Sequence, residues 1–127
     1  MSETRLGPFC VRTEPTQIAA YRNAIGASGD DVPAAFPICW LGQAEIRTAV
    51  EAACAGRLPL HEGQTFDYAR PLEVGTEYRL SLILHEQAHP PRLAANAEIT
   101  TVAGEICLRM ETLLRLVVPA ALLELSA

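Results

Sequence analysis

The sequence predicts an α+β domain in which a helix packs against an antiparallel sheet. Two observations carry this prediction: a helical hydrophobic period in the first half of the chain, and a period of two in the second half. The predicted order is strand, helix, loop, long helix and then four strands. A chain of 127 residues is long enough to bury a core, so we expect one domain over residues 1–127.

The first half begins with a short apolar stretch, Phe9 to Val11, which we expect as a strand. Thr16 is a suitable N-cap for a helix from Gln17 to Ala24, and Gly26 is a suitable end. The inward face of this helix is predicted to carry Ile18, Tyr21 and Ile25. The segment from Gly26 to Pro37 is rich in turn residues and is predicted to be a loop.

The longest helical pattern runs from Cys39 to Ala55, with Gly56 as its predicted end. One face is apolar and small, and the remaining positions are polar or charged. The apolar face consists of Ile46, Ala49, Val50 and Ala53. Such a face allows the helix to lie close to a sheet.

After Gly56 the apolar residues alternate with polar ones, as half-buried strands require. Pro90 and Pro91 interrupt this pattern, and a turn is expected near Gly104. The predicted strands cover Thr65 to Arg70, Tyr78 to Leu84, Leu93 to Thr100 and Glu105 to Val117.

The charge composition excludes several classes of function. The formal net charge is −5, which gives no electrostatic footprint for nucleic acid. All ten basic residues are arginines, so lysine Schiff-base chemistry is excluded, while bidentate contacts to phosphate or carboxylate remain available.

The four cysteines, Cys10, Cys39, Cys54 and Cys107, are scattered and never form a CxxC pair. This spacing predicts isolated, buried thiols in a reducing cytosol and no zinc or redox centre. The first seven residues lack a secretory pattern, and the apolar run from Leu113 to Leu125 is shorter than the roughly 20 residues that span a bilayer. We therefore expect a soluble cytoplasmic protein without a membrane partner.

The stretch from Leu60 to Gly75 is the most informative part of the sequence. Its middle alternates, so that Thr65, Asp67 and Ala69 face one way and Phe66, Tyr68 and Arg70 the other. Pro71 and Gly75 then end the strand. The string resembles the gln-x-phe-x-tyr-x-arg-pro-leu…gly run of the MaoC-like dehydratase family, specifically its amino-terminal-type domain. The resemblance implies a hot-dog fold, a long central helix wrapped by a curved antiparallel sheet, and action on acyl thioesters.

The same family carries its catalytic residues in a loop that reads tyr…gly-asp-x-asn-pro-x-his. Here the matching segment follows Tyr21 and runs from Gly29 to Ala35, with Asp30 at the aspartate position and Pro33 at the proline position. Val32 replaces the asparagine. Ala35 replaces the histidine, and an alanine can neither accept nor donate the proton that hydration of an enoyl thioester requires.

The resemblance therefore implies the non-catalytic, acyl-binding subunit of an (R)-specific enoyl-CoA hydratase or 3-hydroxyacyl thioester dehydratase. Its implied partners are an acyl-CoA or acyl carrier protein thioester and a second hot-dog subunit, with no cofactor. Asp30 and Asp31 are the candidate catalytic residues, or else form a solvated acidic turn. His61, Gln64 and Tyr68 are the candidate substrate-binding residues, although a purely structural histidine at a strand end is the alternative for His61.

Two other functions stay open. One is a homodimeric acyl-CoA thioesterase that activates water with a carboxylate, for which Asp31, Glu45 and Glu51 are candidates. The other is a non-enzymatic module that binds acyl thioesters. His85 and His89 have the spacing of a helical metal site, but their predicted position at a strand end does not suit one.

Overall fold

The computed structural model describes residues 3–120. The order of elements agrees with the prediction, with a short 3-10 helix added. In chain order the elements are β1 (Glu3–Arg12), α1 (Pro15–Ile25), the 3-10 helix η1 (Phe36–Gly42), α2 (Ala44–Cys54), β2 (Leu58–Tyr68), β3 (Glu77–Gln87), β4 (Arg92–Thr101) and β5 (Ile106–Val117).

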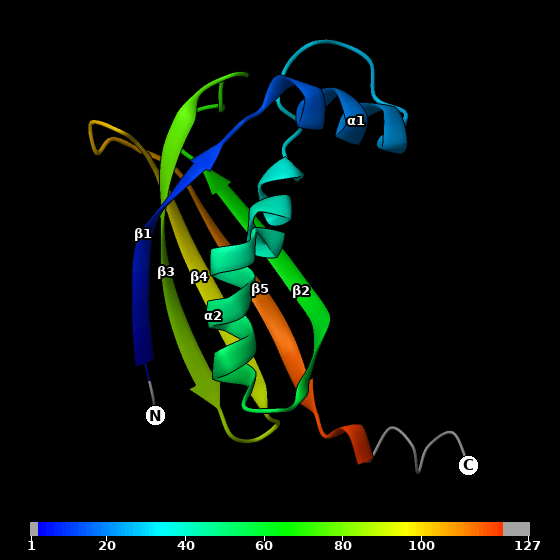
Figure 1. Ribbon diagram of the computed structural model, residues 1–127, viewed down its shortest axis with the longest axis vertical. Helices are drawn as coiled ribbons and strands as arrows, with labels where there is room; N and C mark the ends of the chain where they lie inside the picture. Colours follow the sequence, from blue (N-terminus) through cyan, green and yellow to red (C-terminus); the bar gives the residue numbers. More distant parts are fainter. Residues whose placement is uncertain (1–2, 121–127) are drawn as a thin grey trace.

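The five strands form one antiparallel sheet in the order β1-β3-β4-β5-β2. The sheet curves, and α2 lies over its concave side while β2 bends around the helix (Figure 1). The strands that follow each other from β3 to β5 are neighbours, whereas β1 and β2 take the two edges. The predicted α+β class and the helix wrapped by a sheet are confirmed.

The hydrophobic core lies between α2 and the concave face of the sheet. On β3 and β4 every second residue is buried, as the alternation predicts. Ile46 of α2 is fully buried against this face, and Ala95 and Ala97 are small core residues in the middle of β4. The small side chains leave room for the helix close to the sheet.

The first helix differs from its prediction at the N-terminus. Glu14, and not Thr16, is the N-cap, because its carboxylate accepts a hydrogen bond from the Gln17 amide at 3.0 Å. Gly26 ends the helix with a left-handed backbone, φ 70°, as expected. The inward face carries Ile18 but not Ile25, whose side chain is exposed.

The predicted helix from Cys39 to Ala55 is in fact two helices, η1 and α2. Gln43 separates them with an extended backbone, and its side-chain amide donates to the Cys10 carbonyl at 3.1 Å. Gly42, just before it, has a low helix propensity, so a break costs little at this point. The second helix ends at Cys54, and Ala55 caps it with a left-handed backbone, so the end comes one residue earlier than predicted.

Both edge strands are longer than predicted. β1 begins at Glu3, whereas the sequence predicts a strand only from Phe9. β2 begins at Leu58, whereas the sequence predicts a strand only from Thr65. Edge positions carry polar or exposed residues on both faces, so they lack the alternation of a half-buried strand. β2 also contains an irregularity after His61, which shifts the phase of its pattern. Arg70, predicted within the strand, lies beyond its end.

The prediction that all four thiols are buried is wrong for two of them. Cys54 and Cys107 are buried, whereas Cys10 and Cys39 are exposed. Cys10 lies on the edge strand β1 and Cys39 on the outer side of η1, where neither is covered by the sheet. All four cysteines are free thiols.

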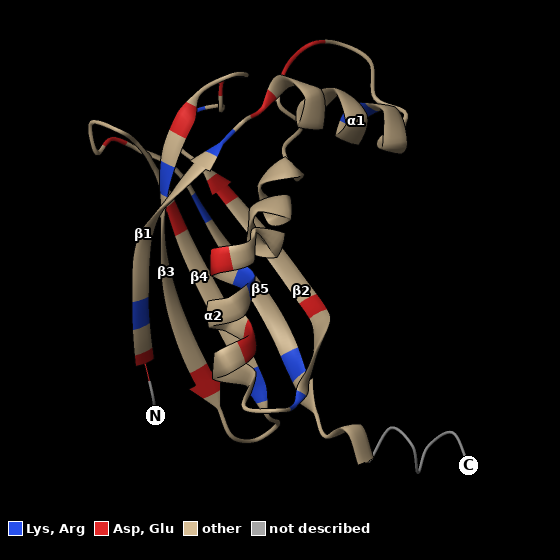
Figure 2. Ribbon diagram, viewed as in Figure 1, with Lys and Arg blue, Asp and Glu red and all other residues tan. Residues whose placement is uncertain are grey.

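Acidic and basic residues are interspersed along the strands and around α2 (Figure 2). This distribution agrees with the absence of a basic patch in the sequence. Among residues 3–120, no helix is both long enough and apolar enough to cross a membrane.

Candidate functional site

A chain of aromatic rings attaches the N-terminal helices to the sheet. Tyr21 meets Phe36 edge-on at 5.6 Å between ring centroids, and Phe36 meets Trp40 edge-on at 6.0 Å. Trp40 in turn lies 6.3 Å from Tyr78 of β3, and its indole nitrogen donates to the Arg12 carbonyl at 3.2 Å. These contacts fix both ends of the loop from Gly26 to Ala35 relative to the sheet.

Arg22 holds this loop from within. Its guanidinium is almost fully buried, and it donates to the carbonyls of Asp31 and Ser28, each at 2.7 Å. It also forms an ion pair with the Asp31 carboxylate. Gly29, between these partners, has φ 103°, a left-handed conformation that favours glycine. The predicted site residue Asp31 is thus committed to the loop's own structure.

Tyr68 joins the loop to the end of β2. Its hydroxyl donates to the Ala34 carbonyl at 2.5 Å. Burial, with a smaller contribution from Tyr21, raises the pKa of Tyr68 to about 12, so the hydroxyl stays a donor. A cavity of 320 Å³ adjoins this contact and is lined by Ala34, Tyr68, Ala69, Arg70 and Pro71, which include the motif residues that first suggested the family.

The other two loop residues of interest lie on either side of this contact. Asp30 is exposed, and the carboxylate that Arg22 binds is that of Asp31. Ala35 is half-buried immediately before η1, at the place where the family pattern has a histidine. Its methyl group supplies no acid or base there.

His61 and Gln64 form a second group, on the helix-facing side of β2. The Nε2 atom of His61 lies 3.3 Å from Oε1 of Gln64, and the same oxygen accepts a hydrogen bond of 2.6 Å from the Thr112 hydroxyl. Thr112 is a buried polar residue on β5, directly opposite Gln64 in the sheet register. The side-chain amide nitrogen of Gln64 donates to the Thr65 carbonyl at 3.3 Å.

The five predicted site residues therefore fall into two groups. Asp30 and Asp31 belong to the loop that Tyr68 contacts at one end of β2, while His61 and Gln64 lie toward the other end of the strand. Tyr68 is seven positions after His61, which corresponds to about 20 Å along a strand. One bound molecule can contact both groups only if it is long and extended.

Sequence reasoning missed Arg22 and Thr112. Both positions carry a usable signal: Arg22 follows Ile18 by one helical turn, on the inward face of α1. Thr112 is an inward position within the apolar alternation of β5. A polar residue at an inward position needs a partner, which points to a structural or binding role.

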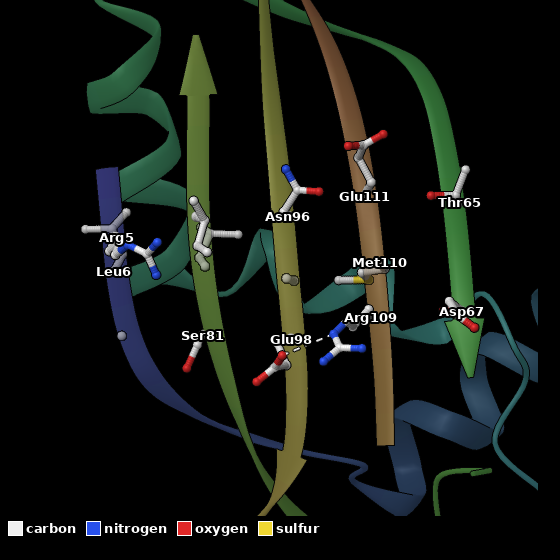
Figure 3. A pocket seen from close by; sticks show the side chains of 14 residues that line it. Arg5, Leu6, Thr65, Asp67, Ser81, Asn96, Glu98, Arg109, Met110 and Glu111 are labelled. Atoms are coloured by element: carbon white, nitrogen blue, oxygen red, sulfur yellow. Dashed lines mark hydrogen bonds and ion pairs between the residues drawn. The ribbon is translucent and has the colours of Figure 1, made fainter. Parts of the chain in front are cut away.

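Two larger hollows lie elsewhere. One of 570 Å³ lies between α1 and η1, and it is lined by Gln17, Ala20, Tyr21, Phe36, Cys39, Trp40, Gly42 and Gln43. The other, of 530 Å³, lies on the sheet face away from α2, where Figure 3 shows Ser81, Asn96, Glu98, Arg109 and Glu111. The lining of this outer hollow contains none of the predicted site residues. Its polar side chains include an ion pair between Glu98 and Arg109 at 3.2 Å.

The carboxylates suggested for a thioesterase are all at the surface. Glu45 and Glu51 are exposed on α2, and Glu51 lies 3.6 Å from Arg47 one turn earlier. Asp31 is paired with Arg22. Neither Asp31 nor Glu51 is therefore an unpaired base poised over a cavity.

No family model matches the sequence, and no curated protein is a sequence match for it. Solved structures do match its fold. One is the HadBC (3R-hydroxyacyl-ACP dehydratase) complex from Mycobacterium tuberculosis, with a TM-score of 0.71 at 13% identity over 88% of this chain and 93% of that one. Another is a MaoC-like dehydratase, with a TM-score of 0.72 at 17% identity, matched over 93% of this chain but only 42% of the longer neighbour.

The (R)-hydratase from A. caviae involved in PHA biosynthesis is a further match. Its TM-score is 0.54 at 18% identity, over 91% of this chain and 94% of that one. At such identities the likeness establishes the fold alone. The sheet order, the helix on its concave face and these neighbours agree, and the chain has the MaoC-like hot-dog fold.

Proposed function

We propose that this chain is the acyl-thioester-binding, non-catalytic subunit of an (R)-specific enoyl-CoA hydratase or 3-hydroxyacyl thioester dehydratase. The observation that carries the proposal is Ala35, which occupies the histidine position of the family loop. Hydration needs a group that takes a proton from water and returns it to carbon. The loop keeps its shape through Arg22 and Tyr68 but lacks that group.

The second subunit in this proposal joins at β2. An edge strand of 11 residues presents unpaired backbone groups along its outer side, which favours pairing with another strand. Leu58 and Leu60 add exposed apolar side chains at its start, with 43% and 46% of their surface accessible. A partner that carries the complete gly-asp-x-asn-pro-x-his loop would supply the acid and base.

An acyl-CoA or acyl carrier protein thioester is the proposed ligand. The hydroxyl of Tyr68 and the polar group around Gln64 mark two ends of a long surface along β2. Such a surface suits an extended thioester better than a compact ligand. The free thiols agree with a cytosolic location, since reducing compartments keep cysteines unpaired.

The test is an assay of crotonyl-CoA hydration, followed by the loss of the enoyl thioester. We expect the pure chain to be inactive and a mixture with a hot-dog protein carrying the complete loop to be active. The matched control is the partner alone at the same concentration. Full activity of the pure chain would contradict the proposal.

A thioesterase would form a different product from a hydratase, and this product distinguishes the two functions. Release of free thiol from a panel of acyl-CoA molecules would favour a thioesterase. No release of thiol from acyl-CoA molecules of any acyl chain length would exclude it. Glu45→Gln is the informative variant, because this carboxylate is exposed on α2 and is not the one that Arg47 binds. For a non-enzymatic module, calorimetry would detect binding of CoA thioesters, and no thioester would be converted to product even when a partner is present.

A further inference from the structure

The irregularity in β2 places His61 on the same face as Gln64. In a regular strand, residues three positions apart point to opposite faces of the sheet. Here His61 pairs with Leu114 and Gly63 pairs with Leu113, so Glu62 is one extra residue in β2. This bulge turns the His61 side chain to the helix-facing side, where Gln64 lies.

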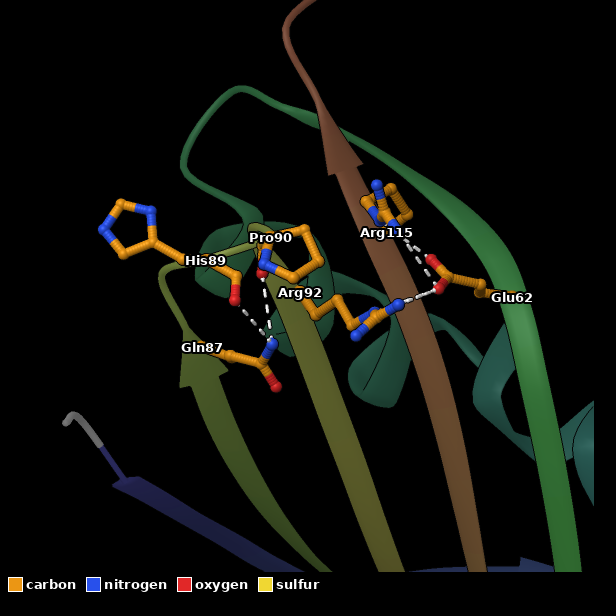
Figure 4. Close-up of polar contacts among 6 residues, drawn as sticks. All are labelled: Glu62, Gln87, His89, Pro90, Arg92 and Arg115. Carbon is orange, nitrogen blue, oxygen red and sulfur yellow. Dashed lines mark hydrogen bonds and ion pairs between the residues drawn. The ribbon is translucent and has the colours of Figure 1, made fainter.

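The bulge is held from the outer face by two arginines. Glu62 accepts hydrogen bonds from Nε of Arg92 and from Nε of Arg115, each at 2.9 Å. Figure 4 shows both guanidinium groups converging on the Glu62 carboxylate. Arg92 and Arg115 also face each other in the register of β4 and β5. The single extra residue is therefore fixed to two neighbouring strands.

From the inner face, Thr112 fixes the orientation of Gln64. The Thr65 carbonyl can only accept, so the Gln64 amide nitrogen faces it and the amide oxygen faces Thr112 and His61. An amide oxygen only accepts, so the neutral His61 ring donates through Nε2. In the tautomer that carries its proton on Nε2, Nδ1 is the acceptor of the side chain.

These contacts orient one exposed histidine on an edge strand. Glu62 and its two arginines fix the backbone, and Gln64 with Thr112 sets the tautomer of the ring. The core does not need this arrangement, because His61 is exposed. A side chain held in this way presents a defined hydrogen-bond acceptor to whatever lies along β2.

We propose that Nδ1 of His61 accepts a hydrogen bond from the 3-hydroxyl of a 3-hydroxyacyl thioester, with Gln64 and Thr112 as positioning residues. The inference rests on the proposed function, in which the ligand is an enoyl or a 3-hydroxyacyl thioester. Of these two, only the 3-hydroxyacyl thioester carries a hydrogen-bond donor on its acyl part. The site thus selects the hydrated form.

The test is calorimetric titration of the pure chain with (3R)-3-hydroxybutyryl-CoA and with butyryl-CoA, which differ by one hydroxyl. We expect the hydroxylated ligand to bind about fivefold more tightly, as one net hydrogen bond provides. Thr112→Val, which is isosteric but lacks the hydroxyl, and His61→Phe should abolish this preference. Thr112→Ser keeps a hydroxyl and should retain it.

His89→Ala is the matched histidine control, since that side chain points away from the Glu62 contacts in Figure 4. It should leave the preference unchanged, and unfolding curves of all variants verify that they are folded. Equal binding of both ligands by the unaltered chain, or a preference that survives in Thr112→Val, would overturn the inference alone. Failure of any CoA thioester to bind would overturn the proposed function and the inference with it.

Discussion

Arg22 fixes the loop between α1 and η1. Its three contacts, to the carbonyls of Ser28 and Asp31 and to the Asp31 carboxylate, come from one buried guanidinium. A planar group with several donors is suited to this task, and lysine cannot replace it. The conformation of this loop therefore depends on one side chain of α1.

Replacing Arg22 with methionine should lower the free energy of unfolding by about 2 kcal/mol, because the loop loses its charged hydrogen bonds. Urea unfolding followed by circular dichroism measures this change. Arg47→Ala is the control: Arg47 is exposed on α2, and its ion pair with Glu51 is worth only about 0.5 kcal/mol. If the two substitutions lowered the free energy of unfolding equally, the contacts of Arg22 with the loop would not stabilise the protein.

Tyr68 gives a pH dependence of known sign. Its pKa is raised from 10.0 to about 12, mainly by burial, so the fold favours the neutral hydroxyl. The stabilisation is complete below pH 10 and is lost as the pH rises from 10 to 12. Tyr68→Phe should remove this loss, so the stability gap between the two proteins should narrow over that range. A gap that is constant with pH would contradict the raised pKa of the Tyr68 hydroxyl.

At the scale of elements, the ends of helices depend on single residues. Gly26 ends α1 with φ 70°, and a Cβ added there would meet nothing within 4 Å. Gly26→Ala should therefore cost about 1 kcal/mol through backbone strain alone. Gly42→Ala is the matched control, since its site is equally open and its φ is not left-handed. Thermal unfolding should separate the two, and an unchanged midpoint for Gly26→Ala would refute this explanation.

The bulge in β2 gives a second prediction for an element. Hydrogen bonds from Arg92 and then Arg115 lower the pKa of Glu62 below its ordinary value of 4.5. The stabilisation is thus present above pH 4.5 and is lost as the pH falls through the lowered value. Glu62→Gln should be less stable than the unaltered chain at pH 7, and this difference should shrink as the pH falls below 4.5. Urea midpoints at pH 7 and pH 3 check this, with Glu51→Gln as the control, and a difference as large at pH 3 as at pH 7 would contradict it.

The interior strands are predictable from the sequence because one face of each is buried. The alternation of apolar and polar residues in β3 and β4 therefore predicts both strands and their buried faces. β1 and β2 are edge strands, and the bulge at Glu62 depends on arginines of two other strands, which no local pattern reveals. The break at Gln43 has the same origin, since its side chain bonds to Cys10 in β1.

The candidate site divides in the same way. Tyr68, Gln64 and the loop from Gly29 to Ala35 follow from a family pattern in the sequence. Arg22 and Thr112 occupy inward positions that the sequence can signal, but the residues that they bind are known only from the folded chain. The separation of His61 from Tyr68 along β2 is likewise a property of the strand's length, which the sequence pattern understated.

For the whole molecule, the fold and the chemistry lead to different conclusions. The hot-dog sheet and the central helix match the fold of proteins such as HadBC and the A. caviae (R)-hydratase. The loop has an alanine at position 35, which can act as neither acid nor base, and β2 is a long edge strand. Both features favour a subunit that binds the thioester and relies on a partner for catalysis.

The most direct test of this account is crotonyl-CoA hydration by the pure chain, by a hot-dog partner with the complete loop, and by the two together. We expect no activity for the pure chain and, for the mixture, activity above that of the partner alone. Hydration by the pure chain at the rate of the mixture would contradict it.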